Sequence, residues 1–391
     1  MKVQTDSFIF GLLCIAILSG CGQGNAEHTT KSGLNIRDFQ TVINGDSTGL
    51  YVLTNANGME VCITNYGGRI VSWMVPDAEG DFRDVVLGFD HIDEYTSKPS
   101  SFGATVGRYA NRINKGRFVL GGDTVQLAVN SGDHTIHGGS EGWQYQVFEA
   151  NQPTDSTLVL SYLSPAGEGG FPGEVSVSVS FAVNRSNELV IHYKAQTTER
   201  TVINMTNHSF FNLSGDHNNL VLEDVLYVNA DRYAPIDSTL ITTGELLPVE
   251  RSPFDFREPI TIGDGLARDS LHAQLKIAEG IDHNFVLDTD RSASVLAARL
   301  YSPQSGIALE IYTSEPGIQV YTGNMLDGTR VGKKGIAYQK QSAVCLEPQH
   351  FPDSPNKAQW PSTVLEPGIP FSSTSVYRFT LGDRQHGPGQ M

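Results

Sequence analysis

The stretch Val175-Ser-Val-Ser-Val-Ser-Phe181 alternates apolar and polar residues at every position. Successive side chains of a β-strand point to opposite faces of a sheet, so this alternation predicts a strand with one buried face and one face toward solvent. A polar segment at residues 184–187 follows, and Leu189-Val-Ile-His-Tyr193 then returns to a largely apolar run. Together the two runs predict an antiparallel β-hairpin.

Similar short runs recur along the chain between turns rich in Gly, Pro, Asn and Asp. They occupy residues 49–53, 60–65, 70–75, 157–163, 222–228, 307–313 and 343–346. Two short helices are predicted, at residues 92–95 and near 260–267, and no longer helical pattern, internal repeat or low-complexity tract is present. Many short strands separated by dense turns indicate an all-β protein, either an antiparallel sandwich or a barrel.

Composition indicates a globular protein with a small ligand. Of 391 residues, 39% are hydrophobic and 18% are charged, which is enough to build a substantial core. Lys and Arg number 27 against 43 Asp and Glu, for a formal net charge of -16. Such a surface repels nucleic-acid phosphates and anionic lipids, so we expect no nucleic-acid partner and a neutral or cationic ligand.

The first residues are expected to be an export signal. Lys2 precedes an apolar run at residues 8–18 that is too short to span a membrane. Leu18-Ser19-Gly20-Cys21 resembles the bacterial lipobox, whose cysteine is lipidated, with an ordinary secretory signal as the alternative. We therefore expect an exported protein, lipid-anchored through Cys21 to a bacterial membrane and facing the periplasm. A polar tether at 22–33, one domain at 34–385 and a tail at 386–391 would follow.

Apart from Cys14 and Cys21 in the export segment, two cysteines remain for the folded body of the protein, Cys62 and Cys345. They are too few for a disulfide framework and lack the paired spacing of a zinc site. We expect both to be buried thiols.

Two glycine-containing motifs carry the first candidate binding residues. Gly107-Arg-Tyr-Ala-Asn-Arg-Ile113 places Asn111 beside Arg112. In a regular strand these neighbours would face opposite sides, so both can reach one cleft only if the backbone is irregular, and a solvated surface arginine is the alternative. Asp133-His-Thr-Ile-His-Gly-Gly139 holds His134 and His137, which would fall on opposite faces of a strand. That spacing argues against a metal site, and the glycines favour close approach of the backbone to a ligand.

Three further motifs place titratable groups among apolar residues. Ile203-Asn-Met-Thr-Asn-His-Ser-Phe-Phe-Asn-Leu213 contains His208, which on this motif alone is equally a satisfied core histidine. Asp282 opens the run Asp282-His-Asn-Phe-Val-Leu287, where a turn cap is the ordinary interpretation. Glu347 ends the apolar run in Ala343-Val-Cys-Leu-Glu347. A carboxylate there must be paired, shifted in pKa or exposed in a cleft, so a catalytic base and a structural salt bridge are both open.

Taken together and in this order, the motifs resemble the aldose 1-epimerase family of the galactose mutarotase type. Three more segments resemble family segments as well, residues 168–173, 230–245 and 315–324. The resemblance runs from about Tyr51 almost to the end of the chain. It implies a single domain folded as a large antiparallel β-sandwich with a sugar in an open cleft.

The resemblance also implies a function, the interconversion of the α and β anomers of free aldohexoses such as glucose and galactose. The glutamate at Glu347 would remove the proton from the anomeric hydroxyl, and the histidine at His208 would protonate the ring oxygen. The open-chain aldehyde then rotates and closes again with the two roles reversed, so neither a metal nor another cofactor is expected. A histidine suits this role because its ordinary pKa lies near 6.5.

Binding roles are implied for Asn111, Arg112, His137 and Asp282, which would hold the sugar hydroxyls and the ring oxygen. Glu315 is a further expected sugar ligand, at a position where some relatives carry glutamine. Around His208, the resemblance places Phe210 where tyrosine is common, while Phe211 is expected to pack beneath the histidine and Asn207 and Ser209 to orient it.

Other functions remain open at this point. A non-catalytic sugar-binding sandwich is one alternative, but such a protein would not need both His208 and Glu347. A glycoside hydrolase needs two carboxyl groups about 5–10 Å apart, for which Glu315 and Glu347 are a conceivable pair. A sugar-phosphate epimerase would need more basic residues around the substrate. The preferred sugar and the oligomeric state do not follow from the sequence.

Overall fold

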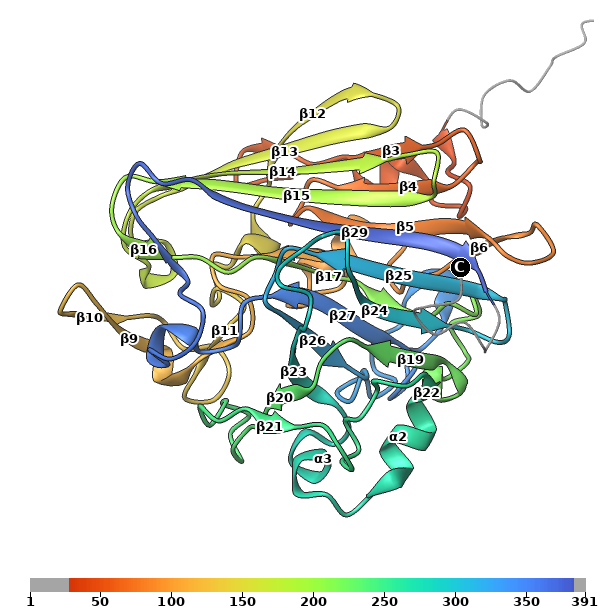
Figure 1. The fold of residues 1–391 in the computed structure, drawn as a ribbon. Coiled ribbons are helices and arrows are strands. Elements are labelled where there is room, and N and C mark those ends of the chain that lie inside the picture. Colours follow the sequence, from red (N-terminus) through yellow and green to blue (C-terminus); the bar gives the residue numbers. More distant parts are fainter. Residues whose placement is uncertain (1–27, 383–391) are drawn as a thin grey trace, which may run out of the picture.

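A computed structural model describes residues 28–382, and two sheets form most of it (Figure 1). The larger sheet has nine strands, and the hairpin predicted from residues 175–193 is its most extensive pair. Its order is β12 (Glu149–Thr154), β13 (Thr157–Ser164), β14 (Val175–Val183), β15 (Glu188–Thr197), β29 (Phe371–Leu381), β25 (Ile307–Thr313), β24 (Leu296–Tyr301), β19 (Val225–Val228) and β22 (Ile260–Thr261). Every pairing within it is antiparallel.

The second sheet has six strands and carries the residues of interest. Its order is β18 (Phe210–Phe211), β27 (Val344–Gln349), β26 (Gly317–Tyr321), β23 (Asp282–Val286), β20 (Arg232–Ala234) and β21 (Leu247–Pro248). A four-stranded sheet of β3 (Leu50–Thr54), β4 (Glu60–Thr64), β5 (Arg69–Pro76) and β6 (Phe82–Asp84) lies beside the two.

Five two-stranded sheets complete the strand set. They pair β1 (Val42–Ile43) with β2 (Asp46–Ser47), β9 (Arg117–Leu120) with β10 (Asp123–Gln126), β8 (Arg112–Ile113) with β11 (Thr135–Ile136), β7 (Ala104–Val106) with β17 (Thr206–His208), and β16 (Thr201–Val202) with β28 (Val364–Leu365). The predicted all-β sandwich is confirmed.

The hairpin shows why these residues form strands. In β14 the valines and Phe181 are buried, while the serines between them are only partly buried or exposed. Val179 lies opposite Tyr193 of β15, and Phe181 lies opposite Ile191. The alternation therefore places the buried apolar side chains on one face, whereas Ala182 and Val190 lie on the other, as expected for a sheet that is covered mainly on one side.

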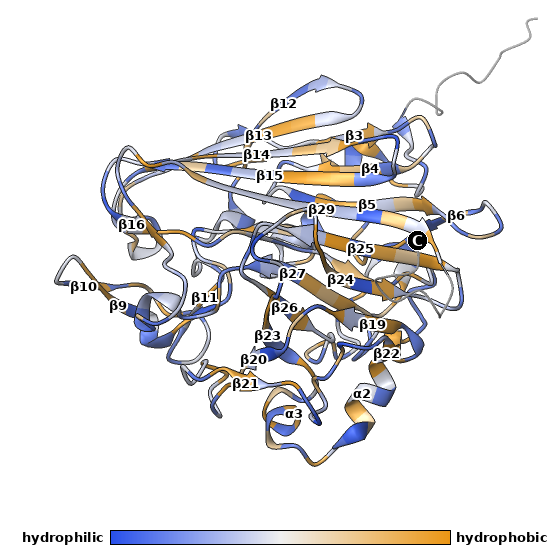
Figure 2. Ribbon diagram, viewed as in Figure 1, coloured by the Kyte–Doolittle hydropathy of each residue, from blue (hydrophilic) through white to orange (hydrophobic). Residues whose placement is uncertain are grey.

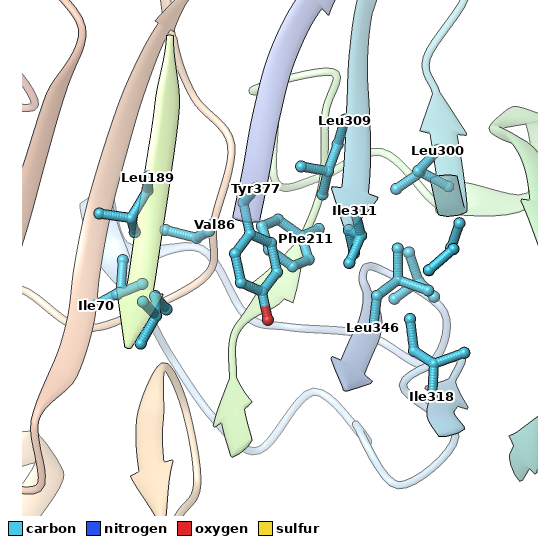
Figure 3. Close-up of a cluster of buried hydrophobic side chains, with 14 of the residues drawn as sticks. Ile70, Val86, Leu189, Phe211, Leu300, Leu309, Ile311, Ile318, Leu346 and Tyr377 are labelled. Carbon is cyan, nitrogen blue, oxygen red and sulfur yellow. The ribbon is translucent and has the colours of Figure 1, made fainter. Parts of the chain in front are cut away.

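The core lies between the facing sheets (Figure 3). Leu309 and Ile311 of β25 and Leu300 of β24 belong to the same buried cluster as Ile318 of β26 and Leu346 of β27. The central strands β24 and β25 are correspondingly apolar in Figure 2. Burial of these side chains is the main favourable contribution to folding, at about 1.5–3 kcal/mol for each large apolar residue.

Three short α-helices are present among the described residues, α1 (Ile92–Thr96), α2 (Ile262–Arg268) and α3 (Ala273–Ala278). The first two match the predicted helices, although residues 260–261 form strand β22 before α2 begins. Helix α3 was not predicted. None of the helices between residues 28 and 382 has the length and apolar character needed to cross a bilayer.

Two predicted strands have different limits. Residues 221–223 form a turn of 3₁₀-helix, so the strand predicted at 222–228 begins only at Val225. The strand predicted at 343–346 continues as β27 to Gln349, so Glu347 lies within a strand and not at its end. Strand β27 tolerates Pro348 at the position opposite Ile318. Cys62 and Cys345 are buried free thiols, as predicted.

The N-terminal segment differs in part from the predicted tether. Residues 28–33 pack on the domain, where the backbone N–H of Lys31 donates to Glu60 at 2.7 Å and Thr30 is buried. Cys21 and the predicted signal segment lie outside the described residues.

Candidate active site

Strand pairing places two of the candidate residues, Glu347 and Asp282, on one face of the six-stranded sheet. Glu347 of β27 lies opposite Gln319 of β26. Asp282 of β23 lies opposite Tyr321, which is also in β26. Paired residues share a face, and alternate residues share it too. Since Leu346 points into the core between the sheets (Figure 3), Glu347 points to the opposite face.

His208 and Glu347 form the centre of the site. Nε2 of His208 lies 3.7 Å from Oε1 of Glu347, and only 9% and 2% of their side chains are exposed. Nδ1 of His208 and Oε2 of Glu347 are buried with no hydrogen-bond partner among residues 28–382. Buried polar atoms are nearly always hydrogen-bonded, so two unpaired atoms at one place indicate a site made for a polar ligand.

Burial shifts the pKa values of this pair in opposite directions. Burial lowers the pKa of His208 from 6.5 to about 4, with a smaller contribution from the charge of Arg69. Burial raises the pKa of Glu347 well above its usual value; the nearby Asp282 adds to this increase and Arg112 opposes it. Both shifts favour the uncharged forms, the neutral imidazole of His208 and the protonated carboxyl group of Glu347.

Asp282 forms a second polar group beside the pair. Nη1 of Arg112 lies 3.6 Å from one oxygen of its carboxylate, and Nε2 of Gln319 donates to the other at 2.6 Å. Oε1 of Gln319 is buried without a partner among the described residues. Asp282, Arg112 and Gln319 therefore form a fixed set of donors and acceptors next to Glu347.

An irregular backbone brings Asn111 and Arg112 to the same site. Asn111 has φ of 61° and His137 has φ of 51°, both in the left-handed region that non-glycine residues rarely adopt. The side chain of Asn111 accepts from the backbone N–H of Arg112 at 2.8 Å, which stabilises this conformation. For both Asn111 and Arg112 to reach one cleft, the backbone between them had to be irregular, and the structure shows that it is.

His137 is held as a hydrogen-bond donor. Its Nδ1 accepts from the backbone N–H of Asn111 at 3.1 Å, so in the neutral ring the proton lies on Nε2. Burial lowers the pKa of His137 well below 6.5, which keeps the ring neutral. Its centroid lies 5.2 Å from that of His208, edge to face.

Aromatic rings fix the plane of His208. The ring of Phe210 stacks on His208 with centroids 5.0 Å apart and stacks in turn on Phe102 at 4.3 Å. Phe211, which was expected beneath the histidine, belongs instead to the core cluster between the sheets, because adjacent strand residues face opposite sides.

Asn207 and Ser209 do orient the local chain, since Asn207 donates to the carbonyl of Gly103 at 2.9 Å and accepts from Ser209 at 2.6 Å.

Comparison with known proteins identifies the family. The aldose 1-epimerase family profile matches residues 49–378. Galactose mutarotase of Mus musculus is 41% identical over 323 residues, covering 83% of this chain and 92% of the mouse protein. Aldose 1-epimerase of Escherichia coli is 32% identical over 337 residues, covering 86% and 96% of the two chains.

The chain belongs to the aldose 1-epimerase family.

Solved structures agree with this assignment. A crystal structure of an aldose epimerase homologue from C. elegans is 30% identical, with a TM-score of 0.80 over 86% of this chain and 100% of the other. Galactose 1-epimerase from Lactobacillus acidophilus is 26% identical, with a TM-score of 0.77 over 88% and 97% of the two chains. The expected mutarotase-type sandwich is thus confirmed.

Glu315 differs from the other residues that the family resemblance selected. Its carboxylate is buried against His350, with Oε2 2.6 Å from Nδ1 of the histidine. Burial tends to raise the pKa of Glu315, yet His350 outweighs this and lowers it. Gln319, four residues later, is the side chain from this segment that contacts Asp282. Sequence reasoning missed Gln319, although its place inside a run that matches the family was a usable signal.

A small cavity lies beside Asp282, and a larger cavity lies elsewhere in the molecule. That small cavity is lined by Asn111, Arg112, Asp282 and Gln319, together with Leu240 and other residues of the neighbouring loop. A cavity of about 880 Å³ lies against β13, β14 and β15 and includes none of the predicted site residues. The larger cavity does not include the close His208–Glu347 pair.

The two histidines of the motif at residues 133–139 do not share a site. Nδ1 of His134 accepts from the backbone N–H of Lys115 at 3.0 Å, while His137 faces His208. A different set, His208, Cys345 and Glu347, has ligand-type atoms within 4.8 Å of one another.

Proposed function

We propose that this protein is an aldose 1-epimerase that interconverts the α and β anomers of free aldohexoses, with His208 and Glu347 as its acid and base. The observation that carries the proposal is the buried, close His208–Glu347 pair with an unpaired atom on each residue. Relatives named galactose mutarotase and aldose 1-epimerase support the reaction class.

The reaction moves one proton at each end of the sugar. Glu347, as the carboxylate, takes the proton of the anomeric hydroxyl while His208, as the imidazolium, protonates the ring oxygen. The C1–ring oxygen bond breaks and the aldehyde forms. After rotation about C1–C2, His208 removes the proton from the former ring oxygen, Glu347 returns one to the aldehyde oxygen, and the opposite anomer closes.

The pKa shifts of His208 and Glu347 favour the protonation state that the pair has while the sugar is in its open-chain form. Ring opening leaves Glu347 protonated and His208 neutral, the same form that burial favours in the free site. The charged form needed at the start carries the same number of protons. It becomes accessible when sugar hydroxyls donate to the carboxylate and lower its pKa, with Arg112 acting in the same direction.

The surrounding residues are proposed to hold the sugar. Asp282 would accept from neighbouring hydroxyls, while Arg112 and Nε2–H of His137 would donate. Gln319 has a free carbonyl oxygen to accept as well. Positioning of this kind prevents the open-chain sugar from drifting, and each general acid or base typically contributes about 10²–10⁴ in rate.

Polarimetry on freshly dissolved α-D-glucose and α-D-galactose tests the proposal. Acceleration that is lost in His208→Asn and kept in His192→Asn supports it, because His192 lies on β15 and bonds Thr374 instead of the catalytic pair. No acceleration with either sugar, or full activity in His208→Asn, would refute the assignment.

The alternative functions have less support from the geometry. A hydrolase based on Glu315 and Glu347 would need both carboxyl groups free, whereas Glu315 is bound to His350. A phosphate ester would need cationic partners, and Arg112 already lies beside Asp282. Hydrolysis of nitrophenyl glycosides, measured beside mutarotation, would reveal a glycosidase.

We also propose that the protein is exported and lipid-anchored through Cys21, on the strength of the lipobox-like sequence at residues 18–21. Fractionation of cells expressing Cys21→Ser tests this point. Release of the variant from membranes supports the anchor, and unchanged membrane association contradicts it.

A further inference from the structure

Three side chains with different donor atoms meet at the catalytic pair. A nitrogen of His208, the sulfur of Cys345 and a carboxylate oxygen of Glu347 all lie within 4.8 Å of one another. Cys345 and Glu347 are two residues apart in β27 and therefore share a face, and His208 ends the neighbouring strand β17. The proposed reaction uses His208 and Glu347 but assigns nothing to Cys345.

We propose that His208, Cys345 and Glu347 form an inhibitory binding site for a thiophilic divalent cation, with Zn²⁺ and Cd²⁺ as the representative ligands. Imidazole nitrogen, thiolate sulfur and carboxylate oxygen are the three donor types that Zn²⁺ takes in proteins. Oε2 of Glu347 is buried without a partner among the described residues, on the carboxylate whose Oε1 faces Nε2 of His208, and this is an independent sign that this carboxylate accepts a ligand.

The geometry requires only small movements. Zinc–ligand bonds of about 2.0–2.3 Å in a tetrahedron place the donor atoms roughly 3.3–3.6 Å apart. Nε2 of His208 and Oε1 of Glu347 are already 3.7 Å apart, and the sulfur must close a separation of at most 4.8 Å. Side-chain rotation can supply this change, and the fourth coordination position stays open for water.

The charges favour such a cation. Burial disfavours a bare negative charge on Glu347 and on Cys345, whose pKa values are both raised well above their usual values. A divalent cation bound to one carboxylate and one thiolate forms a neutral group, which removes that penalty. The thiol and carboxyl protons leave for solvent when the cation binds. Asp282 lies close enough to favour the cation, whereas Arg112 opposes it.

Inhibition follows from the ligand set. A cation held by the nitrogen of His208 and an oxygen of Glu347 occupies the lone pairs that the proposed reaction uses for proton transfer. It also takes the space of the anomeric centre, so sugar and cation should compete. The site therefore gives the protein sensitivity to free transition-metal ions, and removal of the ion by a chelator should restore activity.

Cadmium titration of the full-length protein gives a direct test. Cd²⁺ bound to a thiolate produces a sulfur-to-cadmium charge-transfer absorption in the ultraviolet, which reports binding without any need for activity. We expect the wild type to show one equivalent of absorption that saturating sugar reduces, beyond any contributed by Cys14 and Cys21 of the full-length chain. Because the absorption is independent of mutarotation, failure of this proposal is distinguishable from failure of the proposed function.

Variants of the two buried thiols provide the matched comparison. In Cys345→Ser we expect the absorption to vanish and the Cd²⁺ and Zn²⁺ concentrations for half-inhibition to rise roughly tenfold or more, because a soft ligand is lost. Cys62→Ser removes the other free buried thiol, which bonds Glu60 in β4, and should behave as the wild type. If Cys345→Ser fails to fold, Cys345→Ala takes its place.

Three results would overturn the proposal. One is half-inhibition at the same metal concentration in the wild type and the Cys345 variants. Another is an absorption that persists in those variants and is lost in Cys62→Ser. The third is inhibition of the wild type with no thiolate absorption at all.

Discussion

Leu346 and Glu347 are neighbours in β27, yet they lie in opposite environments. Leu346 packs in the core between the sheets with Ile318 and Ile311, in an apolar environment (Figure 3). Glu347 is just as buried, but one of its oxygens has no partner in the described structure and burial disfavours its charge. One strand therefore carries stability on one face and chemistry on the other. The difference predicts that substitutions at adjacent positions will separate the two properties.

Replacing Glu347 with Gln should have the largest effect. Loss of the proposed base should lower kcat by about 10²–10⁴, measured by polarimetry with α-D-galactose. The folded protein should not be destabilised at neutral pH, because the variant no longer has a buried acid to ionise. Glu149→Gln, an exposed change on β12, is the control and should keep full activity.

The stability of Glu347→Gln should depend on pH with a definite sign. The pKa of Glu347 is raised in the folded state, so the wild-type group contributes most below its ordinary pKa of 4.5, and this contribution is lost as pH rises through the folded pKa. The Tm of the variant relative to wild type should therefore increase with pH. A variant that melts progressively earlier than wild type at high pH would contradict the buried-carboxyl interpretation.

Leu346→Ala should have the opposite effect. Removing a large apolar side chain from a closed core typically costs about 2–5 kcal/mol, so we expect a clear loss in the free energy of unfolding by urea denaturation. Activity per folded molecule should stay within a few-fold of wild type. A variant that keeps its stability and loses kcat would remove the separation between the two faces of β27.

The pH dependence of kcat/KM should reflect the single proton of the proposed catalytic pair, His208 and Glu347. An exposed His and Glu with ordinary pKa values would share one proton only between about pH 4.3 and 6.5. Here the pKa of His208 is lowered to about 4 and that of Glu347 is raised, so the range of the one-proton form should no longer end at the ordinary histidine pKa of 6.5.

We expect a plateau across pH 6.5, with a loss approaching tenfold per unit below about pH 4. Polarimetry at each pH over this range provides the measurement, after the rate of uncatalysed mutarotation at that pH is subtracted. A decline that begins near pH 6.5 would show that burial does not control the pair.

Phe210→Tyr should have the smallest effect. The ring lies between His208 and Phe102, so stacking should be retained. A new hydroxyl group that bonds the sugar would contribute about 0.5–1.5 kcal/mol, which corresponds to roughly a two- to tenfold change in the ratio of kcat/KM for glucose and galactose. An unchanged ratio would exclude this position from sugar discrimination.

Local patterns in the sequence predicted the fold well. The period-two alternation of residues 175–181 is a property of the chain itself, and it survives in the structure because one face of the large sheet is covered. Strand limits were less accurate where tertiary contacts decide them. Strand β27 continues through Pro348 because β26 pairs with it along its length.

The site was predictable only as a set of separate motifs. Asp282, Gln319 and Glu347 come from three strands, and register alone brings them side by side. No local pattern shows register, so sequence alone did not distinguish Gln319, whereas Glu315 was selected from the family resemblance. The stacking of Phe210 instead of Phe211 under His208 likewise depends on which face of β18 is turned toward the site.

Strand β29 has a consequence for the order of folding. It lies between β15 and β25 in the nine-stranded sheet, although it follows every other strand of the domain in the chain (Figure 1). Until residues 371–381 are available, β15 and β25 each present an open edge and the sheet remains in two halves. Pairings so distant in sequence make folding slow, and they delay its completion until nearly the whole domain has been synthesised. In a chain that crosses a membrane before folding, this arrangement would keep the sheet incomplete during more of the crossing.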